Sequence, residues 1–217
     1  VYIAVPIFAY KVCDLGDYGA VADGTQLDDP ALSQALLDCA GGGQVLVPAG
    51  DYLLSPFNLT SNMDLHLSAG ATLLASTHCS AYPVVQPLPS YPDTLGARTG
   101  PFIGGTNITN TSITGRGTIH GQGQAWWHAD PSLFPYGRGR LIEPMFCSRF
   151  SMREVTVRDP PFWGVHPYAC TGVLIEDVQF YAPPDSPNTG AASVSASVTV
   201  PPGSRGCGCA LVHAQHL

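Results

Sequence analysis

The chain repeats part of its own sequence at a spacing of 23 residues. Residues 147–157 align without a gap with residues 170–180, and residues 110–119 fit the same pattern after one extra residue. A period of about 20–25 residues with no helix in the unit indicates a parallel β-helix, in which every coil stacks its apolar side chains on the coil below. The sequence therefore predicts an all-β, single-stranded solenoid of roughly five to seven coils. The alignment places these apolar pairs on adjacent coils: Met152 with Ile175, Val155 with Val178, and Val157 with Phe180.

Short apolar runs separated by Gly, Asn, Ser or Pro fill the chain from residue 45 onward. Such runs predict short strands joined by turns, without a helix between them. They are residues 45–47, 52–54, 65–67, 72–74, 112–114 and 118–119, and residues 126–140 then interrupt the pattern as an insertion.

One helix is expected, over residues 29–39. Asp29 is suited to the N-cap, Pro30 to the first helical position, and the three glycines at 41–43 end the helix. We expect this helix to cap the first coil of the solenoid, because an uncovered end exposes unpaired backbone and apolar side chains. The residues expected to face inward are Leu32, Ala35 and Leu36.

Composition excludes some functions and favours one location. The formal net charge of −7 argues against non-specific nucleic-acid binding, and no uncharged apolar run has the length of about 18 residues that a membrane span needs. Residues 1–10 are apolar and are either the remnant of a signal peptide or a first strand. Seven cysteines and three glycosylation sequons, at Asn58, Asn107 and Asn110, favour a secreted protein of the extracellular space or cell wall. We expect a monomer.

Residues 190–217 break the pattern of the chain. They contain no Asp, Glu or aromatic residue and no copy of the repeat. We expect them to form an unrelated, disordered tail that follows a β-helix domain of residues 12–189. The abrupt change after Thr189 suggests a shift of reading frame or exon structure at that point.

Several motifs, in order along the chain, resemble the polygalacturonase family of glycoside hydrolases, near its plant and bacterial exo-acting branch. They are DYGAVADG at 17–24 with Asp28 and Asp29, VPAGDY at 47–52, GRGTIHGQG at 115–123 with Trp126 and Trp127, PFWGVHP at 161–167, and APPDSPNT at 182–189. The resemblance covers residues 12–189. It implies a right-handed parallel β-helix that hydrolyses α-1,4-galacturonosyl linkages of pectin with inversion, without metal or organic cofactor.

An inverting glycosidase needs two carboxyl groups roughly 6.5–9.5 Å apart, one to protonate the leaving oxygen and one to activate water. In the family these come from an Asn-Thr-Asp motif and from an Asp-Asp pair about one coil later, followed by Gly-His-Gly and Arg-x-Lys. Here Asn188 and Thr189 are followed by Gly190, and no acidic residue follows Asp185. The sequence therefore predicts no catalytic residue, and Asn188 and Thr189 are the remnant of the motif.

Three residues are candidates for binding substrate. They are Asn188, from the remnant motif; His166, which either touches sugar or is a satisfied structural residue; and Asp185, which either binds sugar hydroxyls or stabilises a turn. Six arginines fall between residues 116 and 158, and they form either a zone that binds a polyuronate or a solvated face with local ion pairs. They are Arg116, Arg138, Arg140, Arg149, Arg153 and Arg158.

Other side chains also have two interpretations. Trp126, Trp127 and Trp163 either stack on sugar rings or pack the insertion against the solenoid. Cys147 and Cys170 fall at equivalent positions of neighbouring coils, where stacked reduced thiols are expected rather than a disulfide. The tail residues Cys207, Cys209, His213 and His216 match no usual zinc spacing.

Two further functions compete with a hydrolase. A non-catalytic β-helix fragment or pectin-binding module is favoured by the missing carboxylates. A calcium-dependent lyase is disfavoured, because the chain has no acidic cluster to hold that ion.

Overall fold

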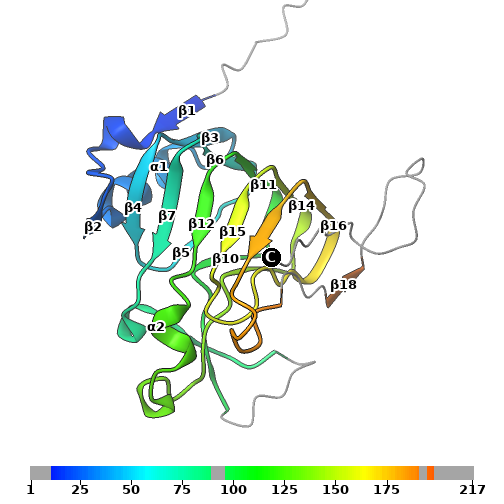
Figure 1. The fold of residues 1–217 in the computed structure, drawn as a ribbon. Coiled ribbons are helices and arrows are strands. Elements are labelled where there is room, and N and C mark those ends of the chain that lie inside the picture. Colours follow the sequence, from blue (N-terminus) through cyan, green and yellow to red (C-terminus); the bar gives the residue numbers. More distant parts are fainter. Residues whose placement is uncertain (1–10, 89–95, 191–194, 198–217) are drawn as a thin grey trace, which may run out of the picture.

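The computed structural model describes residues 11–88 and 96–190, together with the backbone of 195–197. The expectation for residues 1–10, and most of that for residues 190–217, lies outside these ranges. The described chain winds into a parallel β-helix, with successive strands stacked side by side along its length (Figure 1). The predicted fold is confirmed, and its right-handed sense stays a prediction from the resemblance.

The strands of the coils stack on three faces, and faces 1 and 2 have more strands than face 3. Face 1 stacks β1 (Lys11–Asp14), β3 (Gly43–Val47), β6 (Met63–Leu67), β11 (Thr109–Gly115), β14 (Ser148–Arg153) and β16 (Tyr168–Glu176). Face 2 stacks β2 (Asp23–Leu27), β4 (Gly50–Leu54), β7 (Ala71–Ala75), β12 (Thr118–His120), β15 (Thr156–Arg158) and β17 (Gln179–Tyr181). Face 3 stacks β5 (Phe57–Asn58), β10 (Ile103–Thr106) and β13 (Ile142–Met145), and the first residue of β16 pairs with β13.

The remaining elements are short. They are the 3₁₀ turns η1 (Leu15–Tyr18), η2 (Cys79–Ala81) and η3 (Pro131–Leu133), an antiparallel pair of β8 (Val84–Val85) with β9 (Arg98–Thr99), a one-turn helix α2 (Gln124–Trp127), and β18 (Ser195–Ser197), parallel to β16. Helix α2 corrects the expectation of a chain without a second helix; it begins at Gln124, two residues before the expected insertion at 126–140.

The register of the strands follows the sequence repeat. Met152 pairs with Ile175 and Val157 with Phe180 in parallel ladders, while Val155 and Val178 are both buried at the corner that follows. The earlier copy also fits, since Ile113 pairs with Met152 and Ile119 with Val157.

The extra residue of the earlier copy lies in the turn at Gly115. This glycine has φ of +99°, and a Cβ there would collide with the carbonyl oxygen of Leu67 on the coil below. Only glycine fits so close an approach with this backbone conformation.

Alternation along each strand separates the core from the surface. In β3, β6 and β7 every second side chain is buried, and the inward residues of successive coils form one continuous core. A left-handed residue recurs at one corner of the coil, at Asn62, Asn110, Arg149 and Gly172. Asn and Gly tolerate this conformation best, so the turn residues reflect the coil geometry.

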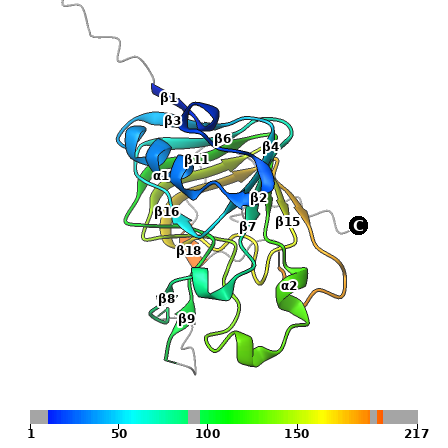
Figure 2. The same cartoon turned by 90° about the vertical axis from the view of Figure 1, so that its left-hand side faces the viewer.

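Helix α1 (Asp29–Asp38) covers the first coil, as predicted (Figure 2). Leu32, Ala35 and Leu36 are 2%, 0% and 8% exposed and belong to the core. The predicted N-cap is wrong by one residue: Asp28 precedes the helix, its carbonyl accepts a hydrogen bond from the Leu32 N–H, and Asp29 is already helical.

The aspartates at the start of α1 secure neighbouring loops instead of capping the helix. The Asp28 carboxylate accepts hydrogen bonds from the amides of Val21 and Ala22, and the Asp29 carboxylate accepts one from the amide of Ser55. This use of side-chain oxygens fixes the helix against the first coils.

Two disulfides stabilise the described chain. One joins Cys13 of β1 to Cys39 just after α1, and the other joins Cys147 to Cys170. The expectation of reduced, stacked cysteines at 147 and 170 is therefore wrong. Their Cα atoms lie 4.4 Å apart on neighbouring coils, which is close enough to be bridged without moving the backbone.

Candidate functional site

The loops that leave face 2 gather along one side of the solenoid. Those that follow β7, β12, β15 and β17 lie together below the strands in Figure 1, and they carry α2, β8 and β9. Every sequence-predicted substrate-binding residue lies on these loops. The candidate site therefore lies on this loop side.

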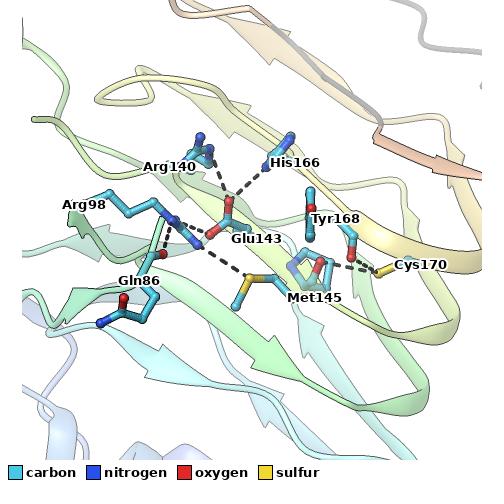
Figure 3. Close-up of polar contacts among 9 residues, drawn as sticks. Gln86, Arg98, Arg140, Glu143, Met145, His166, Tyr168 and Cys170 are labelled. Carbon is cyan, nitrogen blue, oxygen red and sulfur yellow. Dashed lines mark hydrogen bonds and ion pairs between the residues drawn. The ribbon is translucent and has the colours of Figure 1, made fainter. Parts of the chain in front are cut away.

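Beneath the loops lies a buried ion cluster around Glu143 of β13, which we call the Glu143 cluster (Figure 3). Arg98 of β9 donates from Nη1 to Glu143 Oε2 at 2.6 Å, while Arg140 Nε and His166 Nδ1 lie 3.2 and 2.9 Å from Oε1. None of the four is more than 6% exposed. A buried carboxylate is tolerated only when it is paired and hydrogen-bonded, and the surrounding basic groups meet that need.

The aromatic loop 161–167 extends this cluster toward the surface. Phe162 and Trp163 stack at 5.0 Å, and the Arg140 guanidinium lies 4.9 Å from the centre of the Trp163 ring. Arg138 lies over Phe162 and donates hydrogen bonds to the carbonyls of Pro161 and Pro187. Partial burial lowers the pKa of Arg138 from its ordinary value. Arg138 thus joins loop 161–167 to the loop after β17, while Arg140 contacts loop 161–167.

The loop after β17 holds the remnant motif. Ser186 donates from its hydroxyl to the Pro183 carbonyl and contacts the hydroxyl of Thr189. Asn188 is exposed with φ of +54°, and Asp185 is exposed as well. Both side chains are therefore accessible to a ligand.

The structure places His166 differently. Its ring is fully buried, donates a hydrogen bond from Nδ1–H to Glu143 Oε1, and packs edge-on against Trp163. This geometry corresponds to the structural role left open by the sequence, and direct contact of His166 with a sugar stays a prediction.

The arginine zone does not form one patch. Arg140 is buried in the Glu143 cluster, whereas Arg116 and Arg153 form exposed ion pairs with Glu154 and Glu176 at 3.5 and 3.4 Å. Because the chain turns around the coil, arginines that are close in sequence lie on different faces of the solenoid. Arg138 contacts the loop of the remnant motif through the Pro187 carbonyl, and Arg158 lines a hollow together with Ala182 and Pro183 of the same loop.

The tryptophans pack rather than line an open groove. Trp126 is 2% exposed and contacts the rings of Tyr82 and Phe134, which attaches the insertion to the preceding loop. Trp127 is half-buried and donates from Nε1 to the Pro160 carbonyl. Trp163 precedes Gly164, whose amide donates to the Gly190 carbonyl on the loop that carries Asn188.

Sequence reasoning missed Arg98 and the central role of Glu143. Glu143 interrupts the apolar run from Leu141 to Phe146, and Arg98 is the only Lys or Arg between Lys11 and Arg116. A single charged residue within an apolar run indicates a buried ion pair. Neither the position of Glu143 nor that of Arg98 in the sequence identifies the residue with which it pairs.

Within residues 11–88 and 96–190 no group of three or more His, Cys, Asp or Glu side chains is arranged to hold a metal ion. The described helices are also too short or too polar to span a membrane.

Comparison with known proteins gives concordant results in sequence and structure. The family model described as "Glycosyl hydrolases family 28" matches residues 40–201. A "Probable polygalacturonase" of Vitis vinifera is 39% identical over 87% of this chain and 40% of its own length, and an "Exopolygalacturonase" of Zea mays is 29% identical over 81% and 42%. The chain thus spans about two fifths of the length of these curated relatives.

Solved structures agree on the fold. The family 28 exopolygalacturonase of Yersinia enterocolitica superposes with a TM-score of 0.77 at 22% identity, covering 88% of this chain and 42% of the other. The polygalacturonase of Erwinia carotovora gives 0.70 at 22% identity, covering 91% and 56%.

Proposed function

The chain belongs to family 28 of the glycosyl hydrolases, and from this premise we propose that it is part of a polygalacturonase-type hydrolase of pectin. The reaction would be hydrolysis of α-1,4-galacturonosyl linkages with inversion, as the resemblance implies. Residues 12–189 would form the N-terminal part of its β-helix domain, followed by an unrelated tail at 190–217. The match of the family model to residues 40–201, which overlaps the first residues of the proposed tail, is the observation that carries the proposed activity.

The substrate-binding residues in this proposal are Asn188 and Asp185, with His166 acting from beneath. Asn188 and Asp185 are exposed on the loop side, on the loop that Arg138 joins to loop 161–167. Each sugar of a polyuronate carries a carboxylate, for which guanidinium groups are suitable partners. Since His166 is buried against Glu143, it would hold the loop that carries Trp163 rather than bind sugar through its Nδ1.

The chain as given would bind but not hydrolyse. Inversion requires two carboxylates, and the family motifs that the resemblance assigns to them would lie after Asp185, where this sequence has no Asp or Glu. This favours the second candidate function, a non-catalytic pectin-binding module, for the present chain. We propose in addition that the protein is secreted, because two disulfides and three sequons are typical of an oxidising compartment, and we keep the expectation of a monomer.

The first experiment measures catalysis. The purified chain is incubated with de-esterified pectin, and reducing sugar is compared with a boiled control. We expect no excess release, because general acid catalysis alone contributes about 10²–10⁴-fold and the water-activating carboxylate is missing too. Turnover that disappears in Asp185→Asn would show instead that Asp185 is a catalytic acid.

The second experiment measures binding. Retention on immobilised polygalacturonate is compared for Asn188→Gly and Asn110→Gly, two exposed asparagines that share φ of +54°. Glycine accepts this backbone conformation, so each variant loses only a side chain. We expect weaker retention for Asn188→Gly alone. Equal retention of both variants would contradict the placement of the site.

A further inference from the structure

A second polar hollow lies on face 2, away from the Glu143 cluster. It has a volume of about 360 Å³ and is lined by Thr118, Thr156, Arg158, Asp159, Tyr181, Ala182 and Pro183, which we call the face-2 hollow. Its floor is the outer surface of β12, β15 and β17. Among these residues, only Arg158 was a candidate for binding from the sequence, as one member of the arginine zone.

Strand register builds this surface. Thr118 pairs with Thr156, and His120 pairs with Arg158, which in turn pairs with Tyr181. The intervening Ile119, Val157 and Phe180 point into the core, so alternation leaves two rows of polar side chains outside. The hydroxyls of Thr118 and Thr156 therefore lie side by side in one row, and Arg158 and Tyr181 lie side by side in the other.

Asp159 gives the hollow a fixed carboxylate. It is 4% exposed, and its Oδ2 accepts hydrogen bonds from Gln124 Nε2 at 3.1 Å and Arg158 Nε at 3.3 Å. His120 Nε2 lies 3.5 Å from the same oxygen, and its Nδ1 accepts from the Gln122 amide, so the ring proton is on the nitrogen that faces Asp159. No hydrogen bond from the described residues reaches Asp159 Oδ1.

These groups match the chemistry of one class of ligand. Adjacent sugar hydroxyls donate to a carboxylate oxygen and accept from threonine hydroxyls. A uronate carboxylate accepts two parallel hydrogen bonds from a guanidinium, and the Arg158 side chain is 59% exposed. The Tyr181 ring and Pro183 offer an apolar wall for the carbon face of a sugar ring.

The hollow also adjoins the remnant motif. Tyr181, Ala182 and Pro183 also line a neighbouring hollow, together with Thr189 and Gly190. A polymer that crosses this segment would therefore touch both hollows.

We propose that the face-2 hollow is an accessory saccharide site that binds one uronate residue of a polymer held at Asn188. The choice of a polyuronate as the polymer rests on the proposed function. The hollow and its hydrogen-bonding groups are features of the structure and do not depend on that function. In this arrangement Arg158 binds the carboxylate, and Asp159, Thr118 and Thr156 bind hydroxyls.

The test is a titration of the full ¹⁵N-labelled chain with trigalacturonate, followed by amide chemical shifts in NMR. We expect saturable shifts at Thr156, Arg158 and Tyr181. Arg158→Gln should weaken binding at these amides about 10-fold, and Thr156→Val about 3-fold, in line with about 1.4 kcal/mol for a tenfold change and the ordinary range for hydrogen bonds.

Two variants serve as matched controls. Arg153→Gln removes an arginine of similar exposure (51%) from face 1, and Thr72→Val removes the threonine that pairs with Thr118 one coil earlier, outside the hollow. Neither should change the affinity. Thermal unfolding of each variant verifies its fold, and Arg158→Lys, which keeps the charge without the planar fork, should restore only part of the binding.

The outcomes separate the two proposals. Shifts at Asn188 and Gly190 without shifts in the face-2 hollow would overturn the accessory site and leave the proposed function intact. Shifts in the hollow alone, removed by Arg158→Gln, would support the accessory site while contradicting the binding role of Asn188. Equal loss of affinity in Arg153→Gln and Arg158→Gln would reduce the effect to net charge and overturn the accessory site.

Discussion

Replacing Glu143 by Gln tests whether the Glu143 cluster holds the loop side together. The side chain keeps its volume, but one carboxylate oxygen becomes an NH₂ donor. In the structure Oε2 faces Arg98, and Oε1 faces both Arg140 and His166. Either orientation of the amide therefore sets a donor against a basic group, and two buried guanidinium groups lose their counter-charge.

Breaking a buried ion pair by removing one partner typically costs about 3–5 kcal/mol, because the remaining charge stays buried without compensation. All of the groups concerned are at most 6% exposed, so solvent screening does not reduce this figure greatly. A domain of ordinary stability has about 5–15 kcal/mol in total. We expect Glu143→Gln to lose about 3 kcal/mol or more.

Urea unfolding followed by circular dichroism measures the loss. With a slope of about 2 kcal/mol per molar, the midpoint should fall by roughly 1.5–2 M while the slope stays unchanged. Glu154→Gln is the matched control: Glu154 pairs with Arg116 at 3.5 Å, but both side chains are more than half exposed. Such a pair contributes at most about 1 kcal/mol. A loss for Glu143→Gln within 0.5 kcal/mol (about the usual error) of that for Glu154→Gln would refute the reasoning.

Three other predictions follow from the coil structure. Peptide mapping without reductant should recover Cys13 linked to Cys39 and Cys147 linked to Cys170. The double variant Cys147→Ser/Cys170→Ser should lose about 3 kcal/mol of unfolding free energy. Recovery of Cys147 and Cys170 as free thiols would contradict the pairing. Leu32→Ala should cost about 2–5 kcal/mol in urea unfolding because it opens the capping contact, whereas Leu37→Ala, at a position 70% exposed on the same helix, should cost little; equal losses would remove the capping role. Burial lowers the pKa of His120, and this effect exceeds the opposite effect of Asp159, so the unfolded chain binds the proton more readily than the folded chain. The free energy of unfolding should therefore decrease as the pH drops below about 6.5, the ordinary pKa of histidine. His120→Gln should reduce this dependence on pH. An unchanged slope in His120→Gln would show that other groups cause it.

The fold followed from local patterns because a solenoid is nearly one-dimensional. Each coil contacts mainly its neighbours, so a repeat of 23 residues specifies both the strands and their register, as the pairing of Met152 with Ile175 shows. Even the single extra residue at Gly115 was visible in the alignment, since it shifts the pattern within one turn.

The site depended on distances that no period encodes. Arg98 reaches Glu143 across 45 residues because the loops after face 2 differ in length and fold back on the coil, and the same folding buries His166. The alignment placed Cys147 beside Cys170, but only the 4.4 Å separation of their Cα atoms decided for a disulfide. The face-2 hollow likewise combines Thr118, Asp159 and Tyr181 from three successive coils. Alternation and repeat length by themselves determined the coils, because backbone pairing is periodic. Which side chains meet between coils was decided only by the tertiary structure, because the lengths of the loops are not periodic.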